Sequence, residues 1–180
     1  MESIGRVVGF IGHIYFLLLP AILGGILNMV FIKLPILKSL QIPMDGGKSL
    51  KDGRRVFGDN KTWKGFIGMI ALTALSAVLF WHGTFAYSYL YGAWLGFAYA
   101  LFELPNSFIK RRLGMQPGKN GGAIQTFFDQ ADSAIGYTLF LAIVHPLSWL
   151  EAICVLAIAI ATHYLFNVLL FIVKLRGQKG

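Results

Sequence analysis

Two carboxylates, Asp129 and Asp132, stand at the start of an otherwise apolar segment of this 180-residue chain. Residues three apart lie on one face of a helix, so the two side chains are expected to point the same way. An acidic group at bilayer depth is costly, and it normally faces a partner, a water-filled cavity or a bound cation. Magnesium prefers oxygen ligands and often takes one or two carboxylates together with substrate phosphates. We therefore predict that Asp129 and Asp132 hold Mg²⁺ at a phosphate-binding site.

A structural explanation of the same pair stays open. Asp129 would then cap the N-terminus of a helix, and Asp132 would be solvated at the membrane interface or paired with an arginine. Capping accounts for Asp129 better than for Asp132, because the residues that follow are mostly apolar. Glu103, near the end of another apolar segment, is expected to be a third ligand or, more simply, the partner of a basic residue.

A serine and a basic cluster form the second candidate motif. Ser107 and Lys110 would share a face if their segment is helical, and Arg111 follows directly. Lysine offers a point charge and arginine a two-pronged fork, and both bind phosphate oxygens. The alternative is that Lys110, Arg111 and Arg112 only set the topology of a membrane protein.

The third motif runs from Gly58 to Gly65 and combines small, polar and basic residues. Its glycines permit close backbone approach, and Lys61 and Lys64 can neutralise phosphates. Trp63 is expected either to stack on a base or to anchor at the membrane interface. The four histidines show no metal-ligand spacing, so a zinc site is not predicted.

Composition shows where these motifs are held. The chain is 56% hydrophobic and 13% charged, with a mean hydropathy of +0.65, which is unlike a soluble domain. A membrane span needs about 20 mainly apolar residues. We predict an all-α integral membrane protein forming a single domain over residues 1–180. Its five transmembrane helices are expected at about 7–32, 65–82, 84–105, 127–147 and 148–173.

The basic residues predict the orientation of these spans. With five spans, every lysine and arginine except Arg6 falls on one side. The positive-inside tendency makes that side cytoplasmic, with the N-terminus outside and the C-terminus inside. Two long polar loops, 33–64 and 105–126, then lie in the cytoplasm. The net charge of +8 fits both topology and a polyanionic ligand, whereas loops fixed at a bilayer argue against nucleic acid.

Two smaller features concern packing. Gly92 and Gly96 form a Gly-x-x-x-Gly pair that would let helices approach closely. Cys154 is a lone cysteine in an apolar run and is expected to be a small buried hydrophobe.

The three motifs, in this order along the chain, resemble those of archaeal CDP-archaeol synthases. The matching stretches are Gly58–Gly65, Ser107–Gly114 and Phe128–Asp132, and the likeness extends to the small size, the spans and the long first loop. The phosphatidate cytidylyltransferases are more distant relatives. They share a Ser-x-x-Lys-Arg element and paired aspartates with this chain. Their pattern continues with Lys-Asp at the positions where this chain has Gln116 and Pro117.

The resemblance implies a cell-membrane cytidylyltransferase with its active site on the cytoplasmic side. It would use CTP and Mg²⁺ to convert 2,3-di-O-geranylgeranylglycerol 1-phosphate, an unsaturated ether-lipid phosphate, to CDP-archaeol and pyrophosphate. Catalysis would fall to Asp129, Asp132, Lys110 and Arg111. Nucleotide binding would fall to the remaining residues of the motifs, namely Asn60, Lys61, Thr62, Lys64, Gly65, Asn106 and Ser107.

Three other functions remain as alternatives. They are a phosphatidate cytidylyltransferase acting on diacyl lipid, a CTP-dependent polyprenol kinase, and a small membrane transporter. A transporter would be expected to carry acids near mid-span, whereas here the charges gather at one surface.

Overall fold

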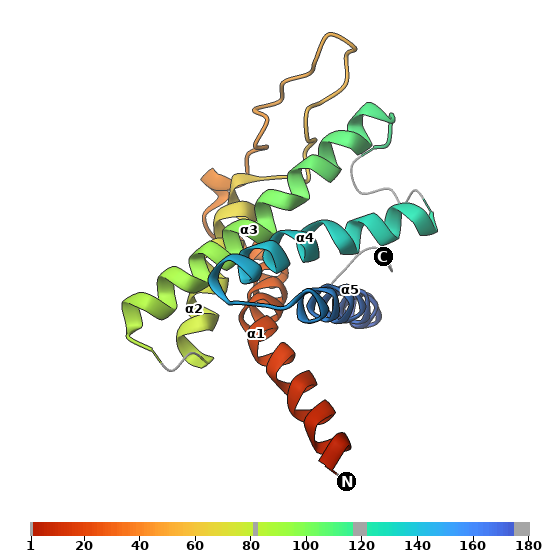
Figure 1. Cartoon of the computed structure of the whole chain (residues 1–180). Coiled ribbons are helices and arrows are strands. Elements are labelled where there is room, and N and C mark those ends of the chain that lie inside the picture. The colour runs from red at the N-terminus through yellow and green to blue at the C-terminus, as the bar shows by residue number, and fades with distance from the viewer. Residues whose placement is uncertain (1, 81–82, 117–121, 175–180) are drawn as a thin grey trace.

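The computed structural model describes residues 2–80, 83–116 and 122–174, and it is built from long helices. These are α1 (Glu2–Lys33), α2 (Trp63–Phe80), α3 (Phe85–Arg112), α4 (Ala123–Val144) and α5 (Trp149–Ile172), with a short 3₁₀ turn, η1 (Lys38–Leu40), after the first (Figure 1). Within these residues the chain forms no β-strand. The predicted all-α architecture is therefore confirmed.

Three of these helices are long and apolar enough to cross a membrane by length and composition. They are α1, from Gly5 onward, α2 and α5. The described parts of α3 and α4 do not meet this standard. That α3 and α4 also cross the bilayer, and that the N-terminus lies outside, stay predictions.

The helix boundaries differ from the predicted ones most at α3 and α4. The helix predicted to end at residue 105 continues through Pro105 to Arg112, and α4 begins at Ala123 rather than at 127. Proline is tolerated in a long apolar helix where neighbouring groups satisfy the freed backbone. Most of the described residues of the second polar segment are thus helical, whereas the first long loop is found as expected. His82, Pro117 and Lys119 lie outside the described residues.

All five helices contribute to one apolar core. Its members include Leu17 of α1, Ala77 of α2, Leu95 of α3, Tyr137 of α4 and Val155 of α5. Cys154 is half-buried and packs against this core, close to what its sequence context predicts.

The Gly-x-x-x-Gly pair brings α3 against α2, as the sequence predicts. A Cβ atom added at Gly92 would lie 2.7 Å from the Cα of Ala74, and one at Gly96 would lie 2.8 Å from the carbonyl oxygen of Met69. Only glycine allows two helix backbones to approach this closely. This contact fixes the height of α3, and therefore of its polar end, relative to α2.

Gly92→Ala should therefore lower the melting temperature of the protein in detergent. The added methyl has no space, and overpacking of a helix interface costs about 1–3 kcal/mol. Gly12→Ala on α1 is the matched control, because a Cβ there meets no atom within 4 Å. Equal melting temperatures for the two variants would show that the close α2–α3 contact is not required.

Candidate active site

A polar cavity of about 330 Å³ opens where the helices meet the first loop. This volume lies in the range of small-ligand sites, which span about 300–1,000 Å³. All of the predicted site residues except Lys64 line it, although they come from segments far apart in the sequence. These are Asn60, Lys61, Thr62, Gly65, Asn106, Ser107, Lys110, Arg111, Asp129 and Asp132.

Asp129 and Asp132 face the same point in this pocket. The side-chain Nδ2 of Asn106, on α3, donates to Asp129 Oδ1 and to Asp132 Oδ2, at 2.7 Å in both cases. Lys110, one turn further along α3, forms an ion pair with Asp129. Asp129 is the seventh residue of α4, whose N-cap is Gly122, so the capping explanation of Asp129 is excluded. Two carboxylates that share one donor can also share one cation.

Arg111 is charged, buried and incompletely bonded. Its exposed fraction is 6%, and its Nε and Nη1 atoms have no hydrogen-bond partner among the described residues. Ser107, one turn earlier on the same face of α3, is also buried and lines the same pocket. Buried guanidinium groups are costly unless paired, so Arg111 is suited to an anion that enters the pocket.

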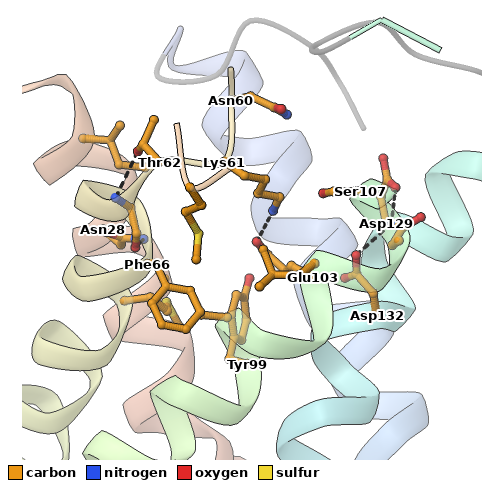
Figure 2. Close-up of a pocket in the computed structure, with 18 of the residues that line it drawn as sticks. Asn28, Asn60, Lys61, Thr62, Phe66, Tyr99, Glu103, Ser107, Asp129 and Asp132 are labelled. Atoms are coloured by element: carbon orange, nitrogen blue, oxygen red, sulfur yellow. Dashed lines mark hydrogen bonds and ion pairs between the residues drawn. The ribbon is translucent and has the colours of Figure 1, made fainter. Parts of the chain in front are cut away.

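Lys61 and Glu103 form an ion pair across the middle of the pocket (Figure 2). The burial of the Lys61 ammonium would lower its pKa, but the charge of Glu103 and the hydrogen bond to it outweigh this and raise the pKa. Lys61 therefore remains a cation in the pocket. Glu103 is the partner of a loop lysine, which is the simpler of the two roles expected for it.

The pocket is polar on both sides of this ion pair. Figure 2 shows Asp129 and Asp132 on one side, and Asn28 and Thr62 on the other. Asn28 Nδ2 donates to the backbone carbonyl of Gly65, at 3.0 Å. The Thr62 side chain accepts a hydrogen bond from the amide of Gly65, at 3.2 Å, at the N-terminus of α2.

Lys64 is the one predicted site residue that the structure does not bring to the pocket. Its side chain is fully buried, and Nζ donates to the carbonyl oxygens of Ile32, at 3.2 Å, and Leu34, at 2.7 Å. These carbonyls lie at the C-terminal end of α1, where a helix has unpaired acceptors and a negative partial charge. Lys64 joins α1 to α2, and the phosphate contact expected for it is not supported by its position.

A buried carboxylate in the first loop holds the Gly58–Gly65 motif in place. Asp45 Oδ2 accepts hydrogen bonds from the amides of Phe57, at 3.0 Å, and Gly58, at 2.9 Å, and Oδ1 accepts one from Gly47, at 3.1 Å. Arg55 Nη2 pairs with the same carboxylate at 2.5 Å. Burial would raise the pKa of Asp45, but the hydrogen bonds from Arg55, Gly58, Phe57 and Gly47 hold it well below its usual range.

The tip of this loop is also attached to α3. Arg112 donates to Asp52, at 2.6 Å and 2.7 Å, and to the backbone carbonyl of Arg54, at 3.0 Å. Figure 1 shows the loop projecting beside the C-terminal end of α3. Arg112 therefore joins the loop to the helix that carries Ser107, Lys110 and Arg111.

Several pocket residues were not predicted from the sequence. They are Asn28 of α1, Tyr99 of α3, Gln125 of α4, and His163 and Asn167 of α5. A signal was present, because Asn28, His163 and Asn167 are polar residues inside predicted spans, and such residues usually face a cavity. Their spacing matches no motif, so the sequence alone gives them no specific role.

Comparisons with known proteins identify the family of this chain. Residues 6–178 match the family model described as CarS-like, CDP-archaeol synthase. The chain belongs to the CDP-archaeol synthase family. It is accordingly an enzyme of the CTP-dependent cytidylyltransferase class, as the three motifs predicted.

Individual relatives support the same assignment. A CDP-archaeol synthase of Pyrococcus furiosus is 30% identical over 145 residues, which cover 78% of this chain and 84% of the relative. One from Thermofilum pendens is 30% identical over 164 residues, covering 88% and 76%. One from Thermococcus onnurineus is 40% identical over 90 residues, covering 47% and 53%.

A solved structure shares the fold. It is described as an intramembrane enzyme for archaeal membrane lipid biosynthesis, with a TM-score of 0.63 and 25% sequence identity. The match covers 86% of this chain and 92% of that one. The present chain is thus a membrane protein of the same architecture.

The loop around Asp45 gives a test of the site's framework. Asp45→Asn should increase hydrogen exchange at the amides of Gly47, Phe57 and Gly58, because a neutral amide is a weaker acceptor and removes the buried partner of Arg55. Asp59→Asn is the control, since Asp59 also pairs with Arg55 but is mostly exposed, and exposed pairs contribute little.

The pH dependence of the same protection follows from the low pKa of Asp45. A carboxyl whose folded pKa lies below its unfolded value of about 3.9 stabilises the fold above that value, and the stabilisation is lost as pH falls through the folded pKa. Protection of the wild-type loop should therefore persist from pH 7 down to about 4 and weaken only below that. Loss of protection near pH 6 would contradict this assignment.

Proposed function

We propose that the pocket joins CTP to 2,3-di-O-geranylgeranylglycerol 1-phosphate, releasing pyrophosphate and forming CDP-archaeol. The observation that carries the proposal is the buried Arg111, with two unpaired nitrogens, in one pocket with Lys61, Lys110 and a pair of carboxylates. Such a site is built for polyanions that arrive with their own counter-ions. The basic residues around the pocket support a position on the cytoplasmic side of the membrane.

The reaction requires little from the protein as an acid or a base. An oxygen of the lipid phosphate attacks the α-phosphorus of CTP, and the bond from that phosphorus to the β-phosphate oxygen breaks. The electron pair leaves with pyrophosphate. The attacking oxygen is already anionic at neutral pH, so no general base is needed. The difficulty is to bring two polyanions together, which makes positioning and charge neutralisation the main contributions.

The residues divide this work by position. Arg111, Lys110 and Lys61 neutralise the triphosphate and the departing pyrophosphate. Ser107, Asn60 and Thr62 donate hydrogen bonds to the nucleotide. Lys110 and Lys61 are paired with Asp129 and Glu103 in the structure, so these lysines exchange a carboxylate partner for a phosphate when substrate enters.

The donor set of the Asp pair fits Mg²⁺. Asp129 and Asp132 present hard oxygen atoms to one point, where the Asn106 amide group donates to both. No group of three or more Asp, Glu, His or Cys suited to a metal occurs in the part of the chain described, so phosphates and water would complete the coordination. When bound, Mg²⁺ supplies positive charge to the triphosphate. Asn106 holds the two carboxylates together when no Mg²⁺ is bound.

The direct test uses purified protein in detergent with labelled CTP and Mg²⁺. We expect CDP-lipid and pyrophosphate with the ether-lipid phosphate and little product with diacyl phosphatidic acid. Preference for the diacyl lipid would assign the chain to the phosphatidate branch. Release of CDP with a polyprenol would instead indicate a kinase, and flux through liposomes without CTP would indicate a transporter.

Substitution of the Asp pair tests the metal role. Asp129→Asn and Asp132→Asn should each reduce kcat/KM by at least about 100-fold, because each removes a carboxylate that would hold Mg²⁺ at the triphosphate. Melting temperatures should stay near the wild-type value. Glu151→Gln is the control, since it also replaces a carboxylate by an amide, in the capping box of α5 and away from the pocket. Near-normal activity of both aspartate variants would remove the metal site from the mechanism.

A further inference from the structure

A second cavity lies directly beside the polar pocket and is apolar. It has a volume of about 80 Å³ and lies between α1, α4 and α5. Most of its lining is aliphatic or aromatic and includes Leu18, Ile22, Ile26, Ala159, Phe166 and Leu170. The cytidyl transfer described above uses none of these residues.

Five residues belong to the walls of both cavities, so the two cavities adjoin along these side chains. They are Gly25, Met29, Tyr99, His163 and Asn167. A ligand that fills both must be charged at one end and apolar at the other. A nucleotide does not meet this description, whereas a lipid phosphate does.

The boundary between the cavities carries a pair of hydrogen-bonding side chains. Tyr99 Oη lies 3.1 Å from His163 Nε2, and His163 Nδ1 lies 3.4 Å from both Ser133 Oγ and the carbonyl oxygen of Gln130. The Tyr99 ring stacks on Tyr137, with 6.1 Å between centroids and 11° between planes. This stacking fixes the phenol, so its hydroxyl is held at the boundary.

We propose that the apolar cavity receives the first carbons of the lipid tails, and that Tyr99 and His163 bind the oxygens of the glycerol backbone. The proposal rests on the proposed function and extends it to the position of the lipid acceptor. The polar atoms of such a lipid between phosphate and tails are ether oxygens, which only accept hydrogen bonds. The Tyr99 hydroxyl can donate at the corresponding place when its oxygen accepts a hydrogen bond from His163 Nε2–H.

The size of the cavity limits how much of the lipid it holds. An apolar cavity of about 150 Å³ holds one benzene molecule, so this space takes only a few carbon atoms. The remainder of each tail must extend outward between α1 and α5, which contact each other little. The site therefore reads the headgroup and the first part of the tails rather than their full length.

Gly25 offers a way to close the passage without disturbing the helices. It lines both cavities, and a Cβ atom added there meets no atom within 4 Å. Gly25→Leu should weaken binding of the ether-lipid phosphate at least about tenfold, since the side chain fills the passage, while CTP binding stays unchanged. Gly12→Leu is the matched control on an exposed position of the same helix that also has open space.

Lipid binding is measured by native mass spectrometry without CTP, so the result stands even if the wild-type protein forms no CDP-lipid. Retained lipid binding in Gly25→Leu would overturn the proposal. An equal loss of CTP binding would also overturn it, because the passage would then belong to the nucleotide site. Failure of the wild-type activity assay alone would count against the proposed reaction and not against this lipid site.

Tyr99→Phe tests the hydrogen bond separately. The KM for the lipid should rise about two- to tenfold, the effect of losing one neutral hydrogen bond, with an unchanged KM for CTP. Tyr137→Phe is the control, because it makes the same change in the stacked ring, which lines only the apolar cavity. Equal effects of the two variants, or a rise in the KM for CTP instead, would contradict a role for Tyr99 in binding the lipid.

Discussion

The constraint on which this structure depends is the compensation of charge inside an apolar helical body. Asp129 and Asp132 lie in a helix that is otherwise largely apolar, where an unpaired carboxylate would be very costly. Their partners, Asn106 and Lys110, come from α3, so the pair can exist only if α3 and α4 lie close together at that level. Gly136 permits this approach, because a Cβ there would lie 2.8 Å from Phe102 Cβ.

The side of the pocket formed by the first loop depends on a different interaction. The Gly58–Gly65 motif has no regular secondary structure before α2, so its shape comes from the buried Asp45 carboxylate and the amides that bond to it. Lys64 then fixes the start of α2 to the end of α1. The Asp45 carboxylate orders the loop and the Lys64 ammonium fixes the helix start, and together they bring Lys61 to Glu103 in the middle of the pocket.

Much of this was predictable because local pattern and chemistry agree. Apolar length predicted five helices, and residue type with spacing predicted most of the polar members of the pocket. The predicted end of α3 was wrong, since Pro105 and the basic cluster resemble a loop although the helix continues. Lys64 was expected at the phosphate site, whereas its side chain joins α1 to α2, and pocket positions for His163 and Asn167 were not predicted. Their roles depend on which neighbour each side chain meets, and that is a property of helix packing rather than of spacing.

The two cavities explain why polar residues occur at two depths in the helices. Ser107, Lys110 and Arg111 occupy the outer end of α3, where charged groups can meet water and nucleotide. Tyr99 lies two turns deeper, in the same helix, and pairs with His163 inside the apolar body. A reaction between a water-soluble triphosphate and a lipid-bound phosphate needs such a gradient, because each reactant must remain in its own solvent while their phosphates meet. The single helix α3, held against α2 by glycines, supplies that gradient from one end to the other.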